Sequence, residues 1–419
     1  MMAKLSPLLA RLPPLTQRQW QLLALVALAA IFGSYSQALL PLALPQIQAE
    51  LAIPADRLSS MGAVIRLGAL PAFLFALSAD RWGRRRLLLV AIAAYALLTG
   101  LTALAPTALF FTLTQFGVRL FVTVAAILAN VMIVEEFPPA ARGWGVGIYT
   151  ALASVGGGSA ALLFALINVV PFGWRALYLV GLLALLFMGI WRTYLPETTR
   201  FQVRQVEQPP TILRLGLAQP LWRLLTVYPG RFAAVATAIL LFNLGGDAAL
   251  FYDPTYLQLQ HGWQPWQIAL LNLGAGFMAL LGSTLAGQVS DRTGRKRATG
   301  IFLSAMSLFI IAYYHAAGWQ LPLFWAGLLF TSIGATVTLN ALSSELFPTA
   351  YRSTATGATA LVATLGGAAS LLLHGLLLNI IASPWTAVSL LALLILLAPL
   401  LLLSLPETSG RSLEEIAPE

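Results

Sequence analysis

Long apolar runs recur along the whole chain and are separated by short segments that hold nearly all of its charges. The runs are about 20 residues long, which is the length that an α-helix needs to cross the hydrocarbon core of a bilayer. Lipid offers the backbone no hydrogen-bond partners, so these runs must be helices rather than open strands. The pattern therefore predicts twelve transmembrane helices. They are expected at 20–44, 59–79, 86–105, 108–134, 143–168, 174–195, 232–258, 266–289, 298–316, 320–344, 353–380 and 384–404.

The composition supports a membrane protein and excludes several kinds of site. Hydrophobic residues make up 59% of the chain and charged residues 9%, whereas ordinary soluble proteins carry about 25% charged residues. The chain has no cysteine, which excludes disulfides, thiol catalysis and thiolate metal sites. The three histidines, His261, His315 and His374, are scattered and show no metal-ligand spacing. We therefore expect no metal and no cofactor.

The net charge of +9 is explained by orientation in the membrane. All Lys and Arg residues except Arg57, Arg66, Arg119 and Arg175 fall near the termini or at and beyond the ends of even-numbered helices. Because loops rich in Lys and Arg stay in the cytoplasm, we predict that both termini are cytoplasmic and that the protein spans the inner membrane of a bacterium. The basic residues then face lipid headgroups, and no nucleic-acid partner is expected.

Short motifs occur twice, once in each half of the chain. The segment 135–142 (EEFPPAAR) matches 345–352 (ELFPTAYR) at an offset of 210 residues. At the same offset, 195–198 and 405–408 both read LPET. Several matches in register indicate two six-helix halves, repeated in parallel about an axis along the membrane normal.

The repeat divides the chain into three parts. We predict an N-terminal six-helix bundle at 1–195, a cytoplasmic linker at 196–231 and a C-terminal six-helix bundle with a cytoplasmic tail at 232–419. The linker holds the pair Pro209-Pro210 and several arginines, which are expected to contact lipid headgroups rather than to form a binding site.

Two charged loops carry a resemblance to a known family. The loops 80–86 (DRWGRRR) and 291–297 (DRTGRKR) resemble the signature of the major facilitator superfamily. The repeated E-x-x-P-x-x-x-R pattern and the LPET segments resemble its sugar-porter and organic-ion-porter branch. The resemblance implies an all-α membrane protein with twelve transmembrane helices in two pseudo-symmetric six-helix bundles. It also implies a transporter that works by rocker-switch alternating access, and not an enzyme.

The sequence departs from the sugar porters where they would bind a hexose. Leu241 and Phe242 stand where sugar porters carry paired glutamines. Asp247 replaces their usual asparagine, and Asn340 replaces an aromatic residue. The glycine run 156–158 lacks the proline that is typical of drug-exporting antiporters. We favour neither a sugar transporter nor an exporter, although a sugar or polyol porter, a multidrug exporter and a non-transporting receptor stay as alternatives.

Three charged residues are predicted to lie at membrane depth, where an ionised side chain costs at least ~2.5–3.5 kcal/mol and is usually functional. Arg66 lies 14 residues before Asp80 and Arg119 lies 16 residues before Glu135, so helical rise places both roughly 21–24 Å from the cytoplasmic end. Asp247 is expected at a similar depth. We predict a central cavity in which an arginine binds an anionic group through two hydrogen bonds and Asp247 takes up a proton. The alternative is a structural ion pair.

Further polar residues are candidates for the lining of this cavity. Asn130 and Asn340 occupy equivalent places in the two halves, and Gln37 corresponds to Asp247 at the repeat offset. Asn243 and Tyr252 are added as weaker candidates. The alternative is that the amides form hydrogen bonds between helices, as they often do in membranes.

Charged residues at the cytoplasmic ends of the helices are predicted to form a gate. Glu135 is expected to pair with Arg84 and Arg142, and the equivalent pairs are expected in the second half. Closed pairs would stabilise an outward-open state; the alternative is that these charges only set the orientation. The predicted gate residues are Asp80, Arg81, Arg84, Glu135, Arg142, Glu197, Asp291, Arg292, Arg295, Glu345, Arg352 and Glu407.

The sequence thus predicts a monomeric secondary transporter. We expect it to move a small organic solute, favouring an organic anion because of the two arginines, as a proton-coupled symporter. The sequence contains no phosphate-binding G-x-x-x-x-G-K loop, no H-E-x-x-H metal motif and no nucleophile elbow, so ATP-driven transport and hydrolysis are not expected.

Overall fold

The computed structural model describes residues 15–207, 218–381 and 383–409. Every regular element in this part of the chain is a helix, and twelve helical spans within it are long and apolar enough to cross a membrane. They lie within a few residues of the predicted positions, from Gln17–Leu42 for the first to Pro384–Leu402 for the last. The predicted all-α membrane fold is confirmed.

The first six spans form one bundle. It begins at Thr16, whose side chain accepts a hydrogen bond from the backbone of Gln19 while the Gln19 side chain bonds back, a capping box that starts the first helix. The elements are α2 (Gln17–Leu42), α3 (Leu44–Glu50), α4 (Ala55–Leu67), α5 (Ala69–Leu77), α6 (Ala79–Trp82), α7 (Arg84–Ala103), α8 (Ala108–Glu136), η2 (Pro139–Ala141), α9 (Arg142–Phe164), α10 (Trp174–Val180), α11 (Leu183–Leu186) and α12 (Met188–Tyr194).

The last six spans form the second bundle, after two helices that fall within the predicted linker. The longest helix of the second bundle, α15, ends at Gly262, whose φ of 66° gives the left-handed turn that glycine allows. The elements are α13 (Thr199–Glu207), α14 (Ala218–Val227), α15 (Pro229–His261), α16 (Pro265–Thr293), α17 (Arg295–Tyr314), α18 (Gln320–Glu345), α19 (Thr349–Leu377), α20 (Pro384–Leu393), η3 (Leu394–Leu396) and α21 (Leu397–Leu402). The boundaries of the three parts stay a prediction.

Some spans are not the continuous helices that the apolar pattern predicts. The second is divided at Gly68, where a Cβ atom would lie 2.5 Å from the main-chain oxygen of Phe116. Glycine therefore lets α8 pack closely against the junction of α4 and α5. The sixth and twelfth spans are divided by tighter turns. In the sixth, one such turn is closed by the hydrogen bond from Gly181 N–H to Tyr178 O.

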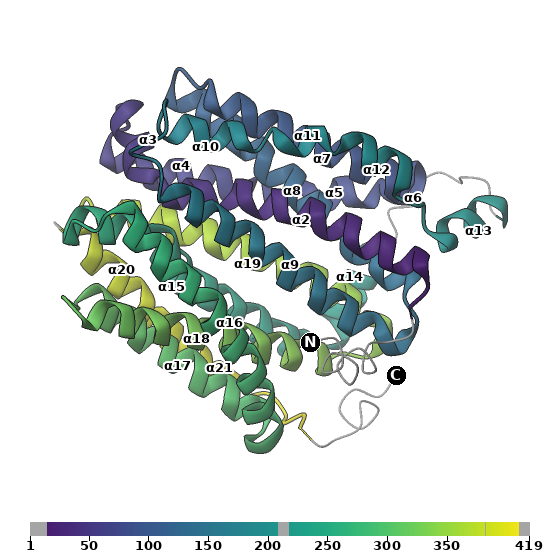
Figure 1. Ribbon diagram of the computed structural model, residues 1–419. Helices are drawn as coiled ribbons and strands as arrows, with labels where there is room; N and C mark the ends of the chain where they lie inside the picture. Colours follow the sequence, from purple (N-terminus) through teal and green to yellow (C-terminus); the bar gives the residue numbers. More distant parts are fainter. Residues whose placement is uncertain (1–14, 208–217, 382, 410–419) are drawn as a thin grey trace, which may run out of the picture.

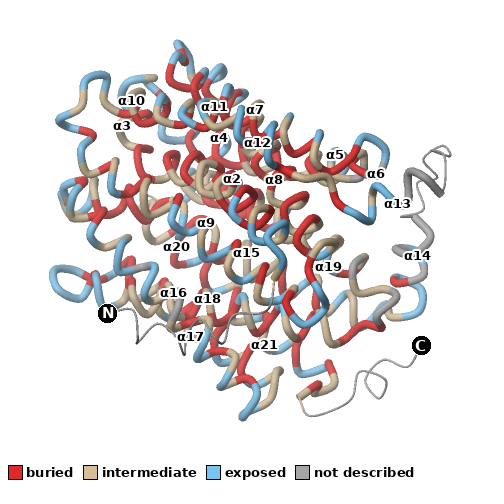
Figure 2. Tube along the Cα trace, turned by 45° about the vertical axis from the view of Figure 1, so that its right-hand side comes forward, coloured by how far each residue is buried: buried red, intermediate tan, exposed pale blue. Residues whose placement is uncertain are grey.

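The two bundles lie side by side, and Figure 1 shows the first in purple to teal and most of the second in green to yellow. Within them α2 packs on α9, α7 on α8, α15 on α19 and α17 on α18. Between them α4 packs on α19 and α9 on α16. Figure 2 shows buried residues concentrated along the inner faces of the helices, whereas leucines such as Leu74 and Leu186 are exposed on the outside, as expected of surfaces that face lipid.

The two ends of the bundles are distinguished by the linker. Thr199 in α13 donates hydrogen bonds to the side chain of Glu136 at the end of α8, and Gln19 at the start of α2 donates to the Glu136 carbonyl oxygen. We call this end the linker face. The opposite end, with the junction of α3 and α4 and the end of α15, is called the distal face (Figure 1).

Candidate functional site

A cavity of about 300 Å³ lies between the two bundles. Helices α2, α4 and α8 of the first bundle line it, together with α15 and α19 of the second. Its walls are mostly apolar, and the charged residues among them are Arg66, Arg119 and Asp247. The three charges that were predicted at one depth are therefore brought together. The lining residues are Gln37, Leu40, Pro41, Gly62, Ile65, Arg66, Gln115, Val118, Arg119, Asp247, Leu250, Phe251 and Leu371.

An ion pair crosses this cavity and joins the bundles. Arg66 Nη2 in α4 contacts Asp247 Oδ2 in α15, and the two side chains are only 28% and 12% exposed. Gly367 in α19 lies directly against the pair, since a Cβ there would overlap both Asp247 Oδ2 and Arg66 Nε. The glycine pair at 366–367 thus allows α19 to close over the ion pair.

Arg119 supplies a second positive charge in the cavity. Its Nη1 donates to Gln37 Oε1 at 2.5 Å, while its buried Nε–H has no hydrogen-bond acceptor among the described residues. Because Arg66 and Asp247 neutralise each other, the positive charge of Arg119 is not balanced by another charge in the lining of the cavity. A cavity with one uncompensated guanidinium and a free donor is suited to an anion.

Ion pairs at the linker face join helices within each bundle. In the first, Arg84 Nη2 lies 3.1 Å from Glu135 Oε1 and connects α7 to α8. In the second, Arg295 Nε lies 3.1 Å from Glu345 Oε1 and connects α17 to α18. Arg295 also pairs with Asp291 at 2.6 Å. Of the predicted pairs, those of Arg84 with Glu135 and of Arg295 with Glu345 are therefore present at equivalent places in the two bundles.

Glu197 and Glu407 accept hydrogen bonds from backbone N–H groups at the starts of helices. The Glu197 carboxylate accepts the backbone N–H of Arg85 at 3.2 Å, and Glu407 accepts that of Arg295 at 2.7 Å. Each carboxylate thus lies at the N-terminus of a transmembrane helix, α7 or α17, where unpaired N–H groups favour negative charge. The residues before these helices, Gly83 and Gly294, have φ of 91° and 97°, and a Cβ at either would lie within 2.7 Å of the carboxylate.

Comparisons with known proteins identify the family. A family model described as Major Facilitator Superfamily matches residues 26–371 and 279–417. The chain belongs to the Major Facilitator Superfamily. It is 26% identical over 360 residues to the cis,cis-muconate transport protein of Acinetobacter baylyi (strain ATCC 33305 / BD413 / ADP1). The aligned region covers 83% of this chain and 85% of that protein.

Other relatives in the superfamily are also transporters. The hexuronate transporter of Bacillus subtilis (strain 168) is 26% identical over 323 residues, covering 75% of this chain and 74% of that protein. A crystal structure of a D-xylose-proton symporter matches with a TM-score of 0.78 at 19% identity, covering 94% of this chain and 99% of the other. The predictions of a major facilitator fold and of a transporter that is not an enzyme are confirmed.

Several residues predicted to bind substrate are not part of the lining of this cavity. Asn130 and Asn243 donate to carbonyl oxygens one turn earlier in their own helices, at 2.9 and 2.8 Å. Asn340 is exposed, and the hydroxyl of Tyr252 contacts Ser59 instead. Of the polar residues predicted to bind substrate, Gln37, Arg66 and Arg119 therefore line the cavity.

Gln115 lines the cavity but was missed by the sequence analysis. It lies four residues before Arg119 on α8, and residues at this spacing share one helix face. Its Nε2 donates to Thr102 Oγ1 at 3.0 Å, which fixes the amide against α7. The helical spacing from Arg119 is the signal that could have identified it.

Other predicted gate residues make different contacts from those expected. Arg142 donates through Nε to the Phe137 carbonyl oxygen at 3.2 Å, and Arg352 donates to the Ser344 carbonyl oxygen at 2.8 Å. Both guanidiniums thus bind carbonyls at the end of a preceding helix, which lack partners within the helix, instead of pairing with Glu135 or its equivalent. Arg81 and Arg292 are exposed. The side chain of Asp80 lies outside the described part of the structure.

The glycines before α7 and α17 lead to a stability prediction. We expect Gly294→Ala to lower the free energy of unfolding by roughly 1–3 kcal/mol, because its backbone conformation is costly for any other residue and the new methyl group would displace Glu407. Thermal unfolding of the purified protein in detergent measures the change. Gly287→Ala in α16 is the control, since a Cβ there meets nothing within 4 Å. Equal melting temperatures for the two variants would contradict the prediction.

Proposed function

We propose that this chain is a proton-coupled secondary transporter of a small organic anion. The observation that supports it most is the cavity between the bundles, in which Arg66, Arg119 and Asp247 meet. A charge at membrane depth costs at least ~2.5–3.5 kcal/mol, so three such charges in one apolar cavity need a reason beyond stability. Binding an anion and a proton supplies that reason.

The anion is bound by Arg119. A guanidinium presents two parallel N–H groups to a carboxylate, and such charge-assisted bonds are about twice as strong as neutral ones. Arg119 has a buried Nε–H without an acceptor among the described residues, and the bond to Gln37 uses Nη1, which lies away from the side of the guanidinium where Nε–H points. Muconate and hexuronate, after which two of the relatives are named, both contain carboxylate groups. This agrees with the assignment. The apolar walls then contact the rest of the solute.

Proton coupling acts through Asp247. A proton on its carboxyl group removes the negative charge, so the ion pair to Arg66 loses its attraction. Arg66 then becomes a second cation for the substrate. The same event releases a tie between the two bundles, because Arg66 lies in α4 and Asp247 in α15. Binding of the proton, binding of the anion and movement of the bundles are thereby linked.

The linker face is assigned to the cytoplasm, where the positive-inside rule keeps basic residues. The ion pairs of Arg84 with Glu135 and of Arg295 with Glu345 hold the ends of the helices together there. We propose that these pairs favour the outward-open state by keeping each bundle's linker-side end in the shape that closes against the other bundle.

Replacing Arg119 tests the substrate site. We expect Arg119→Ala to lower affinity for the transported anion by roughly 10–100-fold, the worth of a hydrogen bond to a charged group. A thermal-shift screen of carboxylates, sugars and amines first finds the ligand, and proteoliposome uptake then measures transport. Arg57→Ala is the control, because Arg57 is exposed and outside this cavity. Normal uptake by a folded Arg119→Ala protein would exclude the anion site.

Replacing Asp247 tests the coupling. In proteoliposomes with an acidic exterior, we expect the wild type to accumulate substrate and Asp247→Asn only to equilibrate it, because the amide cannot exchange a proton. Asp56→Asn is the control, since Asp56 is an exposed carboxylate at the start of α4. Proton-driven accumulation that survives in Asp247→Asn would place the coupling site elsewhere.

Replacing the gate carboxylates tests the role of the linker face. Spin labels at Tyr194→Cys and Leu403→Cys, which are exposed and belong to different bundles, report the separation of the linker-face ends by double electron–electron resonance. We expect Glu135→Gln with Glu345→Gln to increase the long-distance population several-fold, because partly buried ion pairs are lost. The control is Glu50→Gln, which breaks a pair with Arg175 that is 2.7 Å long and confined to the first bundle. Identical distance distributions would limit these acids to setting the orientation.

A further inference from the structure

Three buried polar side chains meet between the cavity and the distal face. They are Ser59 in α4, Tyr252 in α15 and His374 in α19, with exposures of 0%, 5% and 1%. Ser59 Oγ lies 2.7 Å from Tyr252 Oη and 2.9 Å from His374 Nδ1. Ser59 belongs to the first bundle and the other two residues to the second, so both hydrogen bonds cross from one bundle to the other.

The partners of His374 fix the direction of these hydrogen bonds. Its Nε2 lies 3.2 Å from the Pro384 carbonyl oxygen, which can only accept, so Nε2 carries the hydrogen. In a neutral imidazole Nδ1 is then an acceptor. Ser59 therefore donates to His374, and its oxygen accepts the hydroxyl hydrogen of Tyr252. In this series of hydrogen bonds, each of the three side chains therefore has a partner suited to its donor or acceptor.

The cluster lies on the distal side of the charged cavity. Ser59 precedes Arg66 by seven residues in α4, and His374 follows Gly367 by seven in α19. Helical rise therefore separates the cluster from the ion pair by about 10 Å. The cluster thus joins α4 to α15 and α19 between the cavity and the distal face.

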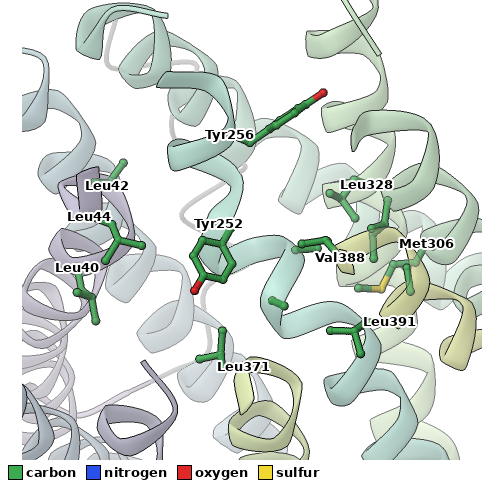
Figure 3. Close-up of a cluster of buried hydrophobic side chains, with 14 of the residues drawn as sticks. Leu40, Leu42, Leu44, Tyr252, Tyr256, Met306, Leu328, Leu371, Val388 and Leu391 are labelled. Carbon is green, nitrogen blue, oxygen red and sulfur yellow. The ribbon is translucent and has the colours of Figure 1, made fainter. Parts of the chain in front are cut away.

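The surroundings of the cluster are tightly packed. A Cβ at Gly62 would lie 3.0 Å from the ring of Phe251 and 3.1 Å from Leu371, and a Cβ at Gly375 would lie 3.0 Å from Ser59 Cβ. Figure 3 shows Tyr252 among hydrophobic side chains of both bundles, including Leu44 and Leu371. Such contacts bring α4 against α15 and α19 and exclude water from the hydrogen bonds.

We propose that Ser59, Tyr252 and His374 form a distal latch, which holds the cavity closed toward the distal face. The latch is uncharged, and this suits a contact that must open in every transport cycle. Each neutral hydrogen bond has a small net worth because water replaces the lost partner. A second contact lies further out, where Gln46 Nε2 donates to Gln258 Oε1 at 2.7 Å across the bundles.

The test measures the separation of the bundles directly. Val169 and Ile380 are 82% and 83% exposed and lie on loops of different bundles at the distal face. Spin labels at Val169→Cys and Ile380→Cys, in this chain without other cysteines, report opening by double electron–electron resonance. The measurement needs no substrate, so it succeeds or fails independently of the proposed anion and proton sites.

Removal of the latch should open the distal face. We expect Ser59→Ala, which removes both hydrogen bonds between the bundles, to raise the ratio of long to short distances about tenfold. His374→Leu removes the acceptor of the buried Ser59 hydroxyl and leaves that donor unsatisfied, so it should raise the ratio by a similar factor. Tyr252→Phe, which removes one hydroxyl and keeps the ring, should give a smaller rise. His374→Asn, whose side-chain oxygen can accept from Ser59, should stay nearer the wild type.

His315→Leu is the matched control, because His315 is exposed and its partners, the Ile311 carbonyl oxygen and Ser389 Oγ, belong to the same bundle as His315. It should leave the distances unchanged. Melting temperatures near that of the wild type show that the variants are folded, and Tyr252→Phe covers the case in which the larger changes prevent folding. Wild-type distances in folded Ser59→Ala and Tyr252→Phe would overturn the latch, as would equal opening by His315→Leu.

Discussion

The ion pair between Arg66 and Asp247 is the constraint on which the arrangement of the two bundles depends. A charge between transmembrane helices has little water around it and must have a partner within reach. Here the partner belongs to the other bundle, so neither bundle can satisfy its own charge alone. The close approach of α19 at Gly367 follows from the same contact. The cavity is therefore both the place where the bundles meet and the place where their contact is open to chemical change.

The linker face shows one structural solution used twice. In each bundle an arginine at the start of a helix pairs with a glutamate at the end of the next, through Arg84 and Glu135 or through Arg295 and Glu345. In each, a glycine with positive φ turns the chain before that helix, and a distant glutamate covers the helix start. The glycines of the repeated motifs are thus required by the conformation of a tight turn. The charged residues of the motifs bind backbone groups as well as one another.

The fold could be predicted from the sequence because the length of an apolar run and the repetition of a motif can both be read directly along the chain. The ion pairs of Glu135 with Arg84 and of Glu345 with Arg295 were predicted from the repeated motifs. The meeting of Arg66, Arg119 and Asp247 was predicted from their equal depth in the membrane. Rotation of a helix about its axis was harder to infer, since apolar residues surround each helix in lipid. Asn130 and Asn243 were therefore placed in the cavity although they bond within their helices. The contact of Ser59 with His374 joins residues 315 positions apart, and no local pattern marks it.

The two contacts of α4 with the second bundle differ in how they depend on the charge of Asp247. The ion pair of Arg66 changes strength when Asp247 binds a proton, whereas the neutral bonds of Ser59 do not depend on that carboxyl. With Asp247 ionised, both contacts hold α4 against α15 and α19. With Asp247 protonated, the uncharged contact remains alone, and neutral hydrogen bonds are weak enough for water to replace them. On the two proposals above, the proton would act on the ion pair alone, and the neutral contact would stay able to open and close in both protonation states of Asp247.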